Sequence, residues 1–327
     1  MSATRRGFGR RAVLAAASAT PVAKARAQAD WPNRPVRFVV AWPPGGGADV
    51  PTRTVAGPIQ RSLGQPVVVD NRGGASGSIG AAAVAQAAPD GYTVLAHTSS
   101  FISHPLLLHG TSYDPSATFA PVTQAVVSPL VLVVRPDHPA QTLADLLERL
   151  RRTPGGIAYA SSGTGGGPHL AGAMLLRRAG VTATHVAHRG GASSAAAILG
   201  GHAAFAFSTL PQAAPLVQEG RLRALAVSTA ERLPNLPEVP TVAEQGFPGF
   251  ALSDWLGFWM PAGTPAEPIA YLREATAAAL REPEVRQRLA RIGMTPVGST
   301  TAAFVAFVKD QRARLAELIR TENIRLE

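Results

Sequence analysis

The chain has 327 residues, 46% of them hydrophobic, which is enough for two ordinary domains or one large one. The formal net charge of +10 overstates its basicity, because residues 1–29 carry six basic residues and no acid, and the rest has 25 basic and 21 acidic side chains. This small, scattered excess does not support nucleic-acid binding. The absence of cysteine excludes disulfides, thiolate metal sites, cysteine nucleophiles and a lipid-modified N-terminal cysteine.

Residues 1–29 have the features of an export signal. The segment Arg5-Arg6-Gly7-Phe8 is a twin-arginine pair followed by an aromatic residue, and a modestly apolar stretch covers residues 12–19. Cleavage is expected near Ala27, after Ala25-Arg26-Ala27, or near Ala29. The alternative is a disordered basic tail. The required order of the three features favours the signal, so the mature protein is expected to be soluble and periplasmic.

Strand-like and helix-like segments alternate from Val36 to about Val227. Some strand candidates are continuous apolar runs, such as residues 130–134, and such runs suit strands buried on both faces of a parallel sheet. Thr142, with Asp145 three residues later, has the pattern of a helix N-cap. The alternation predicts an α/β fold of open doubly wound sheets. Strands are expected at 36–41, 67–70, 92–96, 129–135, 157–160, 182–187, 203–208 and 222–227, and helices near 49–63, 78–88, 142–152, 168–179, 192–200 and 211–219.

The last third of the chain has a different pattern. Residues 231–240 are rich in proline and are expected to be extended, and residues 255–260 form an aromatic strand candidate. Helices are expected near 266–281, 283–292 and 300–321.

Six loops rich in Gly, Ser, Thr and Pro each lie between a strand candidate and a helix candidate. The clearest is residues 42–49, Trp-Pro-Pro-Gly-Gly-Gly-Ala-Asp. Such loops leave backbone N–H groups free at a helix N-terminus, where the positive end of the helix dipole also lies. Because this chemistry holds anions, the six loops predict one anion or carboxylate site assembled from several segments.

Short segments follow one another in a defined order and spacing over about 290 residues. They are 43–49 (PPGGGAD), 63–69 (LGQPVVV), Asn71-Arg72 with the glycine-rich loop after it, 88–93 (APDGYT), 159–163 (YASSG), 169–172 (HLAG), 189–191 (RGG), 222–227 (LRALAV) and 237–241 (PEVPT). In order and spacing the chain resembles the periplasmic solute-binding receptors of tripartite tricarboxylate transporters, the Bug family.

The resemblance implies two α/β lobes with a hinge, periplasmic binding protein type II-like, joined by crossing strands. One lobe would comprise residues 30–131 and 226–327, and the other residues 132–225. It also implies a monomeric receptor, without enzymatic activity or cofactor, that captures a small organic carboxylate for the membrane subunits of a transporter. The chain departs from the family pattern at His188-Arg189, where Tyr-Lys is usual, and in 203–208, where acids are usual; both departures concern the chemistry at the ligand's distal group.

In the first lobe, Pro44, Gly45, Gly46, Gly47 and Ala48 are expected to offer backbone N–H groups to a carboxylate. Asp49 fits either a helix N-cap or a ligand contact. Gly74 and Ala75, and Thr98 and Ser99, follow the next two strands, where their alternative role is helix capping.

In the second lobe, the candidates are Ser161, Ser162, Gly163, His169, Arg189, Gly190, Gly191, Ser208 and Thr209. Arg189 could grip a carboxylate with two parallel hydrogen bonds, although most arginines are simply solvated. Ser208 and Thr209 could instead cap the next helix, and His169 could be structural. Residues 161–169 lack a dinucleotide-binding glycine pattern and a phosphate-loop lysine.

Two alternatives remain at this point. An exported serine hydrolase is disfavoured because Gly-x-Ser-x-Gly, Ser-x-x-Lys and His-Glu-x-x-His motifs are all absent, and His185 with His188 makes only a weak metal site. A receptor that senses its ligand for a signalling partner would keep the same fold.

Overall fold

The computed structural model describes residues 31–107, 111 and 113–321. All the elements described below lie within Pro32–Glu327. The predicted export signal and its cleavage sites lie outside the described residues. Within the described part of the chain, no helix is both long and apolar enough to cross a bilayer.

The first lobe is built on three parallel strands with β1 (Val36–Val40) in the middle, paired in parallel with its neighbours on both sides. Antiparallel β9 (Ser253–Pro261) extends this part of the sheet from β3. The side chains of Phe38, Leu95 and Phe258 are fully buried and form the core here. The other bounds are β2 (Val67–Asn71), β3 (Thr93–Thr98), α1 (Asp49–Leu63), α2 (Ser78–Ala85) and α3 (Ser100–Leu107).

Strand β4 (Phe119–Val134) is shared by both lobes. Its residues 119–129 pair with β9, and its residues 130–134 pair with β7 (Phe205–Thr209). All these pairings are antiparallel, so the expectation of a parallel strand at 130–134 was wrong. The predicted burial is present: Leu130 and Leu132 pack in one core cluster and Val131 in another. A continuous apolar run reports burial on two faces and carries no information on strand direction.

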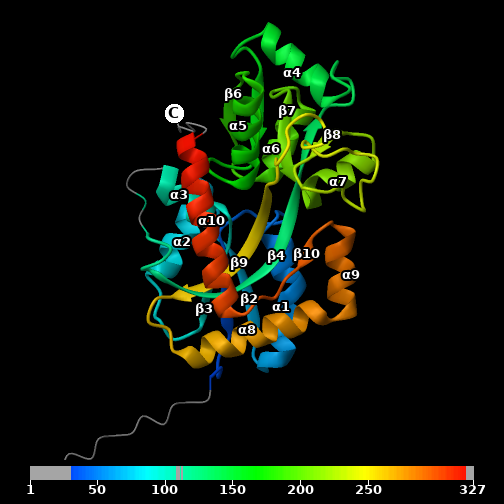
Figure 1. Ribbon diagram of the computed structural model, residues 1–327. Coiled ribbons are helices and arrows are strands. Elements are labelled where there is room, and N and C mark those ends of the chain that lie inside the picture. Colours follow the sequence, from blue (N-terminus) through cyan, green and yellow to red (C-terminus); the bar gives the residue numbers. More distant parts are fainter. Residues whose placement is uncertain (1–30, 108–110, 112, 322–327) are drawn as a thin grey trace, which may run out of the picture. The chain divides into compact units, whose positions relative to one another are not determined.

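The second lobe continues the sheet beyond β4 with parallel strands in the order β7-β5-β6. Figure 1 shows this lobe at the top, around α4 to α7, with β4 and β9 running between the lobes. Thr142 caps α4 in a capping box with Asp145, as predicted. The bounds are β5 (Ala158–Ser161), β6 (Thr184–Ala187), β8 (Arg223–Val227), α4 (Leu143–Arg152), α5 (Gly167–Ala179), α6 (Gly191–Leu199) and α7 (Leu210–Gln218).

The C-terminal region returns to the first lobe after β9. Helices α8 (Ala266–Arg281) and α9 (Pro283–Arg291) precede the short strand β10 (Thr295–Pro296), which pairs with β4. Helix α10 (Thr301–Thr321) then runs lengthwise past β4 and β9 (Figure 1), and its Leu318 packs against the core of the second lobe.

Candidate functional site

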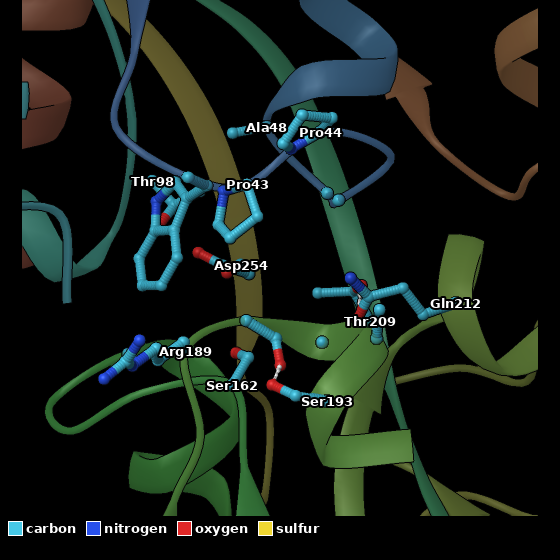
Figure 2. Close-up of a pocket in the computed structure, with 17 residues that line it drawn as sticks. Pro43, Pro44, Ala48, Thr98, Ser162, Arg189, Ser193, Thr209, Gln212 and Asp254 are labelled. Atoms are coloured by element: carbon cyan, nitrogen blue, oxygen red, sulfur yellow. Dashed lines mark hydrogen bonds between the residues drawn. The ribbon is translucent and has the colours of Figure 1, made fainter. Parts of the chain in front are cut away.

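A cavity of about 250 Å³ lies where the loops of the two lobes meet. It is reached by the loops after β1, β3, β5, β6 and β7 and by the start of β9, and Figure 2 shows these segments facing one another. Five of the six predicted loops therefore converge on one cavity. Its lining comprises Trp42, Pro43, Pro44, Gly46, Gly47, Ala48, Thr98, Ser162, Gly166, Arg189, Gly190, Gly191, Ala192, Ser193, Thr209, Gln212 and Asp254.

Four helices begin at this cavity. Their N-cap residues are Ala48 for α1, Gly166 for α5, Gly190 for α6 and Thr209 for α7, and all four line it. In none of the four does the side chain of the cap residue accept a backbone N–H of its helix. Since the N-terminal N–H groups of a helix need acceptors and carry the positive end of its dipole, this arrangement is chemically suited to an anion.

The side chain of Asp49 holds the loop before α1 in place. This residue is the first residue of α1 and does not act as its N-cap, which corrects one of the two expectations for it. Its carboxylate accepts hydrogen bonds from the Gly45 N–H at 2.9 Å, from Arg53 Nε at 2.9 Å and from Asn71 Nδ2 at 2.8 Å. Burial alone would raise the pKa of Asp49, but these hydrogen bonds lower it below its usual value. Asp49 therefore shapes the loop from outside the cavity, and the Gly45 N–H is not free for a ligand.

The cavity has few charges on its wall. Arg189 is exposed and forms no ion pair within the part of the chain that the structure describes, and Figure 2 places it at one side of the cavity. Among the lining residues the only acid is Asp254, on β9. The indole Nε1 of Trp42 is buried and has no hydrogen-bond partner in the described chain, which leaves a donor at the wall.

The structure brings ten of the predicted site residues to the cavity and leaves nine outside its lining. The ten are Pro44, Gly46, Gly47, Ala48, Thr98, Ser162, Arg189, Gly190, Gly191 and Thr209. The nine are Gly45, Asp49, Gly74, Ala75, Ser99, Ser161, Gly163, His169 and Ser208.

Several of these nine residues support the lining loops. The Ser161 hydroxyl donates to the Gly163 carbonyl at 3.0 Å and lies 2.7 Å from His185 Nε2. His169 Nδ1 accepts the Gly165 N–H at 3.0 Å, so its structural role is the one observed. Burial lowers the pKa of His169 to about 3 and that of His185 to about 4, which keeps both imidazoles neutral at pH 7.

The glycine-rich loop after β2 lies behind the loop after β1. Gly74, Ala75 and Ser76 all have positive φ, at 128°, 44° and 50°, so the chain turns sharply there with two non-glycine residues in a left-handed conformation. A Cβ added to Gly77 would lie 2.2 Å from His97 Nε2, so only glycine permits this loop to close over the histidine. This loop supports the cavity wall from behind.

The two lobes contact each other around the cavity, and at Gly163 the contact requires the small size of glycine. A Cβ on Gly163 would lie 3.0 Å from Ser76 Oγ and 3.2 Å from the Trp42 ring. The Ser103 hydroxyl on α3 donates to the Gly165 carbonyl at 2.5 Å, and His104 Nε2 lies 2.7 Å from the Thr164 carbonyl oxygen. These contacts define a closed arrangement of the cleft.

Seven lining residues escaped the sequence prediction: Trp42, Pro43, Gly166, Ala192, Ser193, Gln212 and Asp254. Trp42, Pro43 and Gly166 lie within the predicted loops and Ala192 and Ser193 directly follow one, but none of them was named as a site residue. Gln212 lies inside a predicted helix, where it receives a hydrogen bond from Thr209 Oγ1 at 3.1 Å. Asp254 was signalled only by a lone acid at the start of an apolar aromatic strand.

The Ser161–His185 pair is the only hint of hydrolase chemistry in the described chain. Ser161 is fully buried, so it does not face the cavity. The described residues contain no group of three metal-ligating side chains. Neither feature makes a nucleophile or a metal centre here.

Two lobes, joined by crossing strands and closing on a cavity at helix N-termini, are the architecture of periplasmic solute-binding proteins. The family model described as tripartite tricarboxylate transporter family receptor matches residues 52–324, and the chain belongs to that family. Its members are solute receptors, not enzymes.

Relatives support this assignment over almost the whole chain. Protein BugT of Bordetella pertussis is 35% identical over 303 residues, covering 91% of this chain and 92% of BugT. A structure of an R. palustris protein with adipate matches with a TM-score of 0.87 and 33% identity over 90% of this chain and 99% of that one. The structure of MatC from Rhodopseudomonas palustris with bound malate matches with a TM-score of 0.84 and 29% identity. The match covers 88% of this chain and 100% of the MatC chain.

Proposed function

We propose that the protein is an extracytoplasmic receptor that captures a small organic carboxylate in the cavity between its lobes and delivers it to the membrane subunits of a tripartite tricarboxylate transporter. The observation that carries this proposal is the convergence of four helix N-termini, without side-chain caps, on one cavity. The adipate and malate in the two R. palustris structures are carboxylates, in line with this chemistry.

The free energies of these contacts are sufficient for carboxylate binding. Each helix N-terminus contributes about 0.3–1 kcal/mol to an exposed anion and up to ~2 kcal/mol to a partly buried one. Arg189 can add a charge-assisted hydrogen bond of about 1.5–3 kcal/mol. A micromolar receptor needs only about 8 kcal/mol net, so no dedicated cationic cage is required. The cavity of about 250 Å³ lies at the small end of ligand pockets, which favours ligands of a few carbon atoms.

The hinge belongs to the same proposal. We place the change of lobe after residue 131 and before residue 226, because β4 changes its partner from β9 to β7 between Pro129 and Leu130 and pairs with β8 from Val131 onward. Rotation about these strands would open the cleft, and closure would remove water and strengthen each polar contact. The closed form would present the surface that the membrane subunits bind.

Native mass spectrometry of freshly purified protein, followed by calorimetry, tests the ligand assignment. The panel contains mono-, di- and aromatic carboxylates, each beside its neutral primary amide as a matched control. At least one carboxylate is expected to bind in the micromolar range while its amide does not. Binding of a neutral or cationic solute, with no carboxylate tighter than millimolar, would overturn the assignment. Ligand-dependent retention of the membrane subunits tests delivery separately.

A further inference from the structure

Asp254 is a buried acid placed in a cavity that otherwise favours anions. It is the second residue of β9 and is 6% exposed. Its Oδ1 accepts the Ser99 N–H at 3.1 Å and the Trp255 N–H at 2.9 Å. Two backbone donors on one oxygen fix the orientation of the carboxyl group, and no backbone N–H of the described residues donates to Oδ2. Figure 2 shows the carboxyl group among the lining residues, with Pro43 on one side and Ser162 on the other.

The surroundings of Asp254 come from both lobes and, in the part of the chain that the structure describes, give it no cationic partner. Ser99 precedes α3 in the first lobe, and Gly167 is the first residue of α5 in the second. A Cβ on Gly167 would lie 3.3 Å from Asp254 Cγ, so the missing side chain lets the start of α5 approach the carboxyl group. No cation of the described residues acts on Asp254, whose carboxyl group responds to burial and to its hydrogen bonds alone. Burial raises the pKa of Asp254, and the hydrogen bonds from Ser99 and Trp255 oppose that rise.

This geometry gives the cavity both hydrogen-bond donors and one fixed acceptor. Helix N-termini and Arg189 supply donors and positive charge, and Asp254 supplies a fixed acceptor. A ligand that carries only carboxylate groups would leave this acceptor unpaired and close to its own negative charge, which is unfavourable for both groups. A ligand with a hydroxyl or ammonium group would pair with it.

We propose that Asp254 makes the site selective for carboxylates that carry a hydrogen-bond donor on their carbon chain, that is, hydroxy acids or amino acids. This inference rests on the proposed capture of a carboxylate in the same cavity. A site that presents a buried acceptor rejects an analogue without the matching donor strongly, because the acceptor is then left unpaired. The expected preference for the donor-bearing ligand is at least about ten-fold in Kd.

Calorimetry with three matched ligand series tests the proposal on the wild-type protein: propionate, lactate and alanine; succinate, malate and aspartate; and adipate, 2-hydroxyadipate and 2-aminoadipate. Within each series only the group at carbon 2 changes. In every series that binds, the hydroxy or the amino acid is expected to bind at least ten-fold tighter than the unsubstituted acid. Comparison of the hydroxy with the amino acid identifies which donor the site takes.

The variant Asp254→Asn keeps an oxygen for the two backbone N–H groups and presents an NH₂ group to the cavity. It is expected to lose the preference, with tighter binding of the unsubstituted acids. Asp137→Asn, at an exposed acid on the second lobe outside the cavity, is the control and is expected to leave all nine affinities unchanged.

Two results would overturn the proposal in different ways. If the unsubstituted acids bind as tightly as their hydroxy and amino counterparts, and more tightly as the pH falls, Asp254 acts as a protonated donor; the selectivity proposal then fails and carboxylate capture stands. If none of the nine acids binds, carboxylate capture itself loses its support, and the selectivity proposal falls with it.

Discussion

Mild acid is expected to destabilise this protein through two neutral histidines buried behind the cavity. His97 lies beneath the loop after β1, with its ring 6.1 Å from that of Trp42, and His169 holds the loop after β5. They are 0% and 4% exposed, respectively. Burial lowers the pKa of each to about 3.

The direction and size of the effect follow from these pKa values. Above pH 6.5 the histidines are neutral in both the folded and the unfolded chain, so they add no pH dependence. Below pH 6.5 the unfolded chain takes up protons and the folded chain does not, until the pH approaches about 3. Each histidine then removes about 1.4 kcal/mol of unfolding free energy per pH unit.

Between pH 6.5 and 4.5 the two histidines together remove about 5 kcal/mol as an upper value. His185, whose pKa burial lowers to about 4, and His104, whose pKa burial also lowers, add to this loss. Asp254 acts in the opposite direction, because its raised pKa makes the folded chain bind a proton before the unfolded chain does. The net loss is still a large part of the roughly 5–15 kcal/mol stability of a typical domain.

Urea unfolding at pH 7.5, 6.0, 5.0 and 4.5 measures this loss. His169→Asn, whose side-chain oxygen can replace Nδ1 as an acceptor, is expected to lower the slope by about 1.4 kcal/mol per pH unit, the contribution of one histidine. His202→Asn, at an exposed histidine, is the matched control and is expected to keep the wild-type slope. An unfolding free energy that stays flat from pH 7.5 to 4.5 would refute the neutral, buried state of the two histidines.

Three further predictions concern the cavity. Arg189→Gln is expected to weaken carboxylate binding about ten-fold, the loss of one charge-assisted hydrogen bond, and Arg152→Gln on the surface of α4 is expected to have no effect by calorimetry. Asp49→Asn is expected to lower the unfolding free energy by about 2 kcal/mol and to weaken binding, because an amide offers one acceptor oxygen where the Gly45 N–H, Arg53 and Asn71 use both oxygens of the carboxylate; unchanged binding would count against that role. Gly163→Ala is expected to hold the lobes apart, lowering affinity at least ten-fold and expanding the protein in small-angle X-ray scattering. Gly155→Ala, also at positive φ but with no neighbour within 4 Å, should leave both measurements unchanged.

The sequence predicted most helices and strands closely. This holds where the hydrophobic periodicity of a segment stops at residues, such as glycine, that end a helix or strand. Helix α1 begins at Asp49, just after the glycine run, and ends before Gly64 in a left-handed cap, as its pattern indicates. Helix α3 was missed because it is short and contains Pro105. The first half of β4 was missed because Pro121 and Gln124 interrupt its apolar pattern.

The candidate site was predictable to the extent that parallel strands end at one edge of a sheet. Thr98 and Thr209 end such strands, Ser162 and Arg189 follow such strands, and all four line the cavity. Asp254 could not be placed in this way, because β9 is antiparallel to β3 and contributes its first residues to the cavity. The contacts between the two lobes, and the glycines that permit them, depend on the closed arrangement of the cleft. No local sequence pattern encodes them.

The central claim is that backbone N–H groups from both lobes share one carboxylate. A crystal structure with the tightest-binding acid of the panel tests it directly. The claim predicts carboxylate oxygens within hydrogen-bond distance of N–H groups at residues 46–48 of one lobe and 190–192 of the other. A ligand held by side chains alone, or bound outside this cavity, would contradict it.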